Sequence, residues 1–164
     1  MAEIIKLAPG EPCPEAQSGD VLLIKGTGWL SHLIMLAEPY SHVITRTRPH
    51  YADAQARGVV RRPVETYEEA ERVLVRVDAA EADRQQMEAF AESVLRAKWR
   101  YSYLGFAVTA LMMLTGGRLS VRRYNTSYCS GLAAETLVRA GYIFEKPPSS
   151  VTPGDLARHF GVTA

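Results

Sequence analysis

Apart from a short helical stretch at residues 29–37, the spacing of apolar residues changes from strand-like to helical near residue 78. Before that point, short runs rich in β-branched residues alternate with turn residues, and after it apolar residues recur at helical spacing. Strands that are followed by helices indicate the α+β class. Residues 1–18 are rich in Pro, Glu and Gly, and we expect an extended lead-in there. Strand-like runs predict an antiparallel sheet of about five strands: residues 21–24, 41–47, 50–54, 59–64 and 73–77.

Helical patterns account for most of the second half of the chain. Asp78 and Glu81 form an arrangement like a capping box at the start of an expected helix, which runs to about residue 98. No repeat or break in composition divides the chain, so we predict a single domain over residues 1–164. Further helices are expected at residues 29–37, 104–114 and 129–139, and after Thr152, where Pro153 takes an early helical position.

The composition excludes several classes of protein. With 164 residues, of which 47% are hydrophobic, the chain can bury a core and is not disordered. The net charge of +1 argues against binding to nucleic acid. Cys13 and Cys129 lie too far apart for a disulfide framework or a zinc site.

The sequence also shows no targeting or membrane segment. The N-terminus does not have the pattern of a signal peptide, and the apolar run at residues 104–114 is too short to span a bilayer. We therefore expect a cytoplasmic protein without stable membrane insertion, although export by a signal-independent route would leave the same pattern. The composition implies no particular oligomeric state.

Cys129 stands at the start of a predicted helix. Asn125, Thr126 and Ser127 are residues that commonly cap helices, and Gly141 is a natural C-terminal stop. A thiolate in the first turn would be stabilised by the positive end of the helix dipole, which is a favourable position for a nucleophile. The alternative is that Cys129 is a small core residue, as free cysteines often are.

A cysteine nucleophile requires a base, and the base requires an acceptor that orients it. Among the four histidines, His42 opens a predicted strand, a rigid position that suits a catalytic imidazole. Asp53 lies on the next predicted strand, and its carboxylate can reach the imidazole if the two strands are antiparallel neighbours. The alternatives are a structural histidine and a turn aspartate. A metal site of His42, His50 and Asp53 is conceivable, but no histidine pair has metalloprotease spacing, and we expect no metal or organic cofactor.

The order of these motifs resembles that of a known family. The resemblance is to the circularly permuted papain-like branch of the NlpC superfamily, the YiiX/YaeF-like hydrolases, in which the histidine strand precedes the cysteine helix. It extends from about residue 19 to about residue 159. Three positions depart from the family pattern: Asp53 stands where Glu is usual, Ile44 where Gly is frequent, and Gly131 where an acidic residue is frequent. The motifs are Gly-Asp-Val-Leu-Leu at 19–23, Ser-His-Val at 41–43, Gly-Val-Val-Arg-Arg-Pro at 58–63, Tyr-Cys-Ser-Gly-Leu at 128–132 and Thr-Pro-Gly-Asp-Leu at 152–156.

The resemblance implies a permuted papain-like fold in which Cys129 is the nucleophile, His42 the base and Asp53 the orienting residue. It implies a thiol-dependent hydrolase or acyltransferase that cleaves an amide, in a peptide, an amino-acid amide or a cell-wall peptide, through a thioacyl intermediate. The expected partner is thus a small peptide, amide or acyl substrate. Two alternatives stay open: acyl hydrolysis or transfer on a lipid or other ester at the same site, and a binding module that keeps the fold without the activity.

In either reaction, backbone N–H groups at the start of the cysteine helix would meet the oxyanion. Tyrosine hydroxyls are candidates for a further donor, and the residues concerned are Tyr103, Tyr124 and Tyr128.

Overall fold

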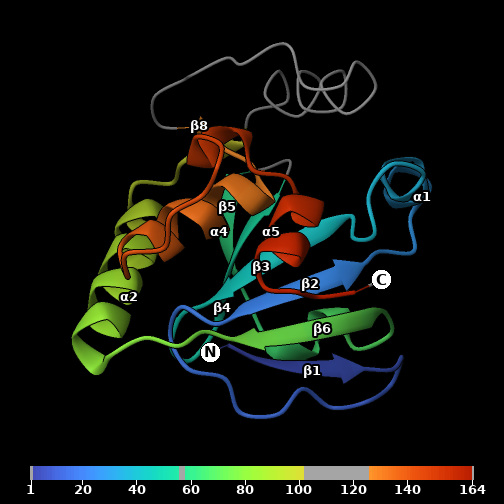
Figure 1. The fold of residues 1–164 in the computed structure, drawn as a ribbon, viewed down its shortest axis with the longest axis horizontal. Helices are drawn as coiled ribbons and strands as arrows, with labels where there is room; N and C mark the ends of the chain where they lie inside the picture. Colours follow the sequence, from blue (N-terminus) through green and yellow to red (C-terminus); the bar gives the residue numbers. More distant parts are fainter. Residues whose placement is uncertain (1, 56–57, 102–125, 164) are drawn as a thin grey trace.

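The computed structural model describes residues 2–55, 58–101 and 126–163, and it shows an α+β protein built on an antiparallel sheet (Figure 1). The strands of this sheet are β1 (Glu3–Leu7), β2 (Val21–Lys25), β3 (His42–Arg46), β4 (Tyr51–Gln55), β5 (Gly58–Arg62) and β6 (Glu71–Arg76). The helix α1 (Trp29–Met35) connects β2 to β3, and the 3-10 turn η1 (Val64–Tyr67) connects β5 to β6.

The second part of the chain is helical, and the predicted α+β class is confirmed. Its helices are α2 (Glu81–Arg96), α4 (Cys129–Val138) and α5 (Pro153–His159), and the 3-10 turn η2 (Pro148–Ser150) precedes α5. A short parallel ladder pairs β7 (Arg100–Tyr101) with β8 (Thr126–Ser127), just before α4.

The strands of the main sheet lie in the order β1-β6-β2-β3-β4-β5, and all neighbouring pairs are antiparallel. The strands expected from the sequence are present within a few residues of their expected bounds. The expected lead-in over residues 1–18 is wrong in part, because β1 pairs with β6 from Glu3–Arg76 to Leu7–Arg72 and makes the sheet six-stranded. β1 is an edge strand with mostly exposed side chains, so it lacks the apolar pattern of a buried strand.

Helices α2, α4 and α5 lie over one face of the sheet (Figure 1). The opposite face is covered by the segment that follows β1 and by η1, which contribute Ala16 and Tyr67. β2 and β6 are thus buried on both faces, which explains their continuous apolar runs. The core between sheet and helices includes Val21, Leu23, Val43, Val75, Met87, Ala133, Leu137 and Leu156.

Asp20 ties the start of β2 to the end of β6 and to α2. Its carboxylate accepts hydrogen bonds from the backbone N–H groups of Gln17 at 2.7 Å and Val77 at 3.0 Å, and from the guanidinium of Arg84 at 3.0 Å. Arg84 also donates to the carbonyls of Ser18 and Val77. Because both charged side chains are buried, this cluster holds α2 against the sheet.

The helix starts expected near residues 78 and 152 have different outcomes, and α4 begins at Cys129 with Tyr128, not one of the cap-type residues 125–127, as its cap residue. α5 begins as predicted, because Thr152 and Asp155 form a capping box with both hydrogen bonds at 3.0 Å, and Pro153 follows the cap. The capping box expected at Asp78 and Glu81 is wrong. α2 begins at Glu81, and its cap residue is Ala80. The two positions of a capping box are therefore residues 80 and 83, two residues later than expected.

The apolar run at residues 104–114, for which the sequence predicts a helix, lies outside the described residues. Within the parts of the chain that the structure describes, no helix has the length and apolar character needed to cross a membrane.

Candidate active site

Cys129 is the first residue of α4, and its side chain is partly exposed. The residues on both sides of it are anchored to the segment that leads into α5. The hydroxyl of Tyr128 donates to the carbonyl of Ser149 at 2.7 Å, and the hydroxyl of Ser130 donates to the carbonyl of Val151 at 2.7 Å. These two contacts hold the start of α4, and with it the thiol, in a defined position.

His42 is the first residue of β3, and its side chain is 20% exposed. Asp53 lies on β4, which is the antiparallel neighbour of β3, as the predicted contact with His42 requires. Nε2 of His42 and Oδ1 of Asp53 are 2.8 Å apart. The structure therefore brings the predicted imidazole and carboxylate into direct contact.

Asp53 is fully buried and accepts hydrogen bonds from several sides. While Oδ1 faces His42, Oδ2 accepts from the hydroxyl of Tyr67 at 2.7 Å and from the amide of Gln55 at 2.7 Å. Nε of Arg62 lies 3.7 Å from the same oxygen. A buried carboxylate with these partners can remain ionised.

The charges of the site favour a protonated imidazole. Burial lowers the pKa of His42, but the charge of Cys129, the hydrogen bonds to Asp53 and Cys129 and the charge of Asp53 together raise it to about 10. Burial alone would raise the pKa of Asp53, yet the hydrogen bond and charge of His42, followed by the hydrogen bonds of Tyr67 and Gln55, lower it below its usual range. The pKa of Tyr67 is raised by burial and by the nearby carboxylate, so its hydroxyl stays a donor.

This arrangement can perform nucleophilic chemistry at a carbonyl carbon. Because Nε2 of His42 faces Asp53, Nδ1 is the ring nitrogen that remains for Cys129. A proton can pass from the thiol to Nδ1 while Asp53 orients the ring and balances its positive charge. The first N–H groups of α4 have no acceptor within the helix, so the helix start that carries Cys129 can supply donors for an oxyanion.

The tyrosine hydroxyls considered from the sequence are not all in the described part of the chain. Tyr128 donates its hydroxyl proton to Ser149, so this proton is not directed at an oxyanion. Tyr103 and Tyr124 lie outside the described residues. Within residues 2–55, 58–101 and 126–163, no group of three or more His, Cys, Asp and Glu side chains could hold a metal ion.

Two side chains of the site were not identified from the sequence, Gln55 and Tyr67. Gln55 lies two residues after Asp53 on the same strand, so the strand period of two places both on one face, and this signal could have identified it. Tyr67 comes from η1, 14 residues after Asp53, and no local pattern connects it with the site.

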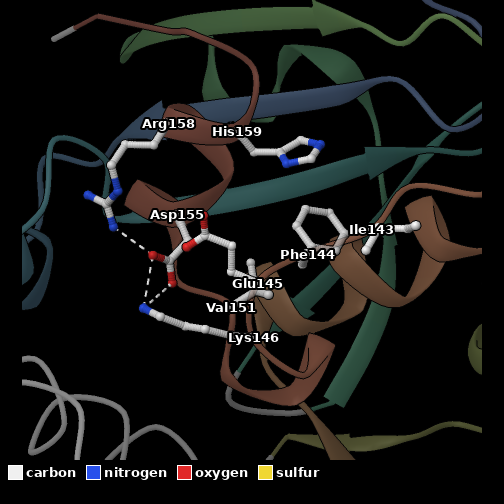
Figure 2. Close-up of a pocket in the computed structure, with 8 residues that line it drawn as sticks. All are labelled: Ile143, Phe144, Glu145, Lys146, Val151, Asp155, Arg158 and His159. Carbon is white, nitrogen blue, oxygen red and sulfur yellow. Dashed lines mark hydrogen bonds and ion pairs between the residues drawn. The ribbon is translucent and has the colours of Figure 1, made fainter.

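A separate hollow of about 370 Å³ lies between α5 and the segment that follows α4 (Figure 2). Phe144 and Ile143 line its apolar side, and its two cationic side chains are already paired, since Asp155 accepts from Lys146 at 2.9 and 3.0 Å and from Arg158 at 2.6 Å. None of the three predicted site residues lines this hollow, and its lining contains no thiol or hydroxyl nucleophile. We therefore place the candidate active site at Cys129.

No protein-family model matches this chain, and no curated protein is similar to it at a significant level.

Proposed function

We propose that this protein is a cysteine-dependent hydrolase or acyltransferase that cleaves amide bonds, with a circularly permuted papain-like fold. One observation carries the proposal: Nε2 of His42 on β3 lies 2.8 Å from Oδ1 of Asp53 on β4, and α4, which begins at Cys129, packs against β3. The permuted fold is supported by the order of these elements, because the histidine strand precedes the cysteine helix and the helix packs against that strand.

The reaction would proceed in two halves. In the first, the proton that Cys129 gives up is held by His42, and Sγ attacks the carbonyl carbon of the substrate while N–H groups of α4 bind the oxyanion. The C–N bond then breaks, the amine leaves with the proton from His42, and a thioester remains on Cys129. In the second, His42 takes a proton from water or another acceptor, which attacks the thioester, and the product leaves as the thiol is restored.

An amide is proposed ahead of an ester because of the leaving group. An amine leaves only when it is protonated, whereas the alcohol of an ester needs this help less. Asp53, whose carboxylate lies 2.8 Å from Nε2 of His42, favours the protonated ring, so His42 can hold this proton until the amine leaves. A peptide, an amino-acid amide or a cell-wall peptide is thus the substrate class that the site suits best.

The proposal is tested by assaying a panel of amide, peptide and ester substrates with the wild type, Cys129→Ala and His42→Ala. Cys13→Ala is the matched control, since it removes the other partly buried free thiol and leaves the site intact. We expect Cys129→Ala and His42→Ala to lose activity by about a thousandfold or more, and Cys13→Ala to keep it. Equal turnover by the wild type and Cys129→Ala would contradict the proposal.

Alkylation distinguishes an active enzyme from a binding module of the same fold. With iodoacetamide below the ordinary thiol range, an activated Cys129 reacts faster than Cys13 of the same chain, and peptide mass spectrometry reports both sites at once. A Cys129 that reacts no faster than Cys13 would favour the binding module.

A further inference from the structure

We propose that Tyr67 is a positioning residue for the imidazole and carboxylate: its hydroxyl holds Asp53 and its ring restrains His42. This inference rests on the proposed function and names a residue outside the predicted set of Cys129, His42 and Asp53. Tyr67 belongs to η1, which lies between β5 and β6 and carries none of those three residues.

The contacts of Tyr67 use both parts of its side chain. The hydroxyl donates to Oδ2 of Asp53 at 2.7 Å, while Oδ1 of the same carboxylate faces Nε2 of His42 at 2.8 Å. Rotation of the carboxylate would therefore break both contacts together. The ring centroid of Tyr67 lies 5.6 Å from that of His42, with the planes tilted by 49°, so the same residue also packs against the imidazole.

Gln55 sets the direction of the Tyr67 proton. Its amide nitrogen donates to Oδ2 of Asp53 at 2.7 Å and to the Tyr67 oxygen at 3.1 Å. Its carbonyl oxygen accepts from Arg62 at 2.6 Å, which fixes the orientation of the amide. Because the Tyr67 oxygen accepts from Gln55, its own proton is available to Asp53, and the network runs from the surface to the imidazole.

Four elements place polar groups against Asp53. These groups are His42 of β3, Gln55 of β4, Arg62 of β5 and Tyr67 of η1, and Cys129 of α4 acts through His42. A hydrogen bond to the carboxylate favours its ionised form, so loss of the Tyr67 hydroxyl raises the pKa of Asp53. As the pH falls, Asp53 would then become protonated earlier and its support of the imidazolium would be lost at a higher pH.

The experiment compares Tyr67→Phe with Tyr142→Phe in the full chain. Both substitutions remove a hydrogen-bonded hydroxyl and keep the ring, but the hydroxyl of Tyr142 contacts the backbone of Asp78, at 3.1 and 3.2 Å, and not the site. Two readouts are followed against pH: the rate of Cys129 alkylation by iodoacetamide, and the ring signals of His42 in nitrogen-15 NMR.

The rate of Cys129 alkylation falls as the pH is lowered, and we expect Tyr67→Phe to move this fall to a pH about one unit higher. A hydrogen bond to a charged group changes its protonation equilibrium by about a factor of ten. Protonation of Asp53 also changes the nitrogen-15 chemical shifts of the His42 ring, and the pH of this change should move by the same amount. Gln55→Met removes the other side chain that donates to Oδ2 of Asp53, at 2.7 Å, and should move both pH values in the same direction. Tyr142→Phe should move neither pH value.

The inference is overturned if Tyr67→Phe and Gln55→Met leave both pH values unchanged: the pH at which Cys129 alkylation falls off in acid, and the pH of the His42 chemical-shift change. This holds even if both variants are less stable. The NMR readout needs neither substrate nor a reactive thiol. A wild-type Cys129 that alkylates no faster than Cys13 therefore speaks against the proposed function, while the titration of His42 still decides the role of Tyr67.

Discussion

The hydroxyl of Thr152 donates a hydrogen bond of 3.0 Å to Oε1 of Glu38, which lies 114 residues earlier in the chain. The other carboxylate oxygen of Glu38 occupies the space that a Cβ atom would take on Gly154. Glu38 leads from α1 into the strand of His42, and Thr152 caps α5, so this buried contact joins the site strand to the last helix. The glycine of the Thr-Pro-Gly-Asp-Leu motif thus makes room for a carboxylate.

Gly154→Ala is expected to lower the free energy of unfolding by about 2 kcal/mol, because the new methyl group displaces the buried carboxylate of Glu38 and breaks its hydrogen bond to Thr152. Gly28→Ala is the matched control, since nothing lies within 4 Å of its Cβ position, and we expect a change within about 0.5 kcal/mol. Urea unfolding measures both variants. Equal stability of the two would show that Glu38 does not occupy this space.

Arg84→Met is expected to lower the free energy of unfolding by about 3 kcal/mol. The substitution leaves the carboxylate of Asp20 buried without its ionic partner, and the side chains of this pair are 0% and 10% exposed. The control is Glu71→Gln, which breaks the ion pair between Lys25, 28% exposed, and Glu71, 52% exposed. Because this pair is exposed, the free energy of unfolding should fall by less than about 1 kcal/mol. A loss for Arg84→Met as small as that of the control would contradict the role of Asp20.

The fold class and most strands could be predicted because periodicity is a local property. β2 and β6 have continuous apolar runs since both of their faces are buried, and turn residues mark the ends of β3 and β4. β1 could not be recognised in this way. It is an edge strand with mostly exposed side chains, and its identity as a strand depends on pairing with β6, more than sixty residues later.

The contact of His42 with Asp53 could be predicted because both residues lie on neighbouring strands, where sequence order gives the pairing. Tyr67 and Glu38 could not be found by the same reasoning. Each reaches its partner through a turn or a linker, and nothing in their local sequence sets the direction of the side chain. For Gly154 the sequence shows a glycine in a motif, but the reason for it is a carboxylate from another part of the chain.

Asp53→Asn is expected to slow Cys129 alkylation at neutral pH by about tenfold or more. The carboxylate accepts hydrogen bonds at both oxygens, whereas the amide of Asn has one oxygen and one NH₂ group. The NH₂ group would face either Nε2 of His42 or the donors Tyr67 and Gln55, and the hydrogen bonds on that side would be lost. The loss of negative charge also lowers the pKa of His42 by about one to three units. Alkylation at the wild-type rate would show that Asp53 does not support the imidazole.

His42 is expected to stay protonated through neutral pH in the folded protein. Its pKa is raised from 6.5 to about 10, because the charge and hydrogen bond of Cys129 and those of Asp53 outweigh the lowering by burial. Folding therefore raises the pKa, so the charged ring favours the folded state below pH 6.5, and this contribution is lost as the pH rises toward about 10.

Cys129→Ala tests this expectation because it removes the thiol that contributes to the shift. The pKa of His42 should fall toward 6.5 in this variant, and Cys13→Ala should leave it unchanged. NMR titration of the ring gives the pKa directly, and urea unfolding from pH 6.5 to about pH 10 should show a steeper loss of stability for the wild type than for Cys129→Ala. A wild-type ring that titrates near 6.5, with the same pH dependence of unfolding in both chains, would show that Cys129 and His42 do not interact as charges.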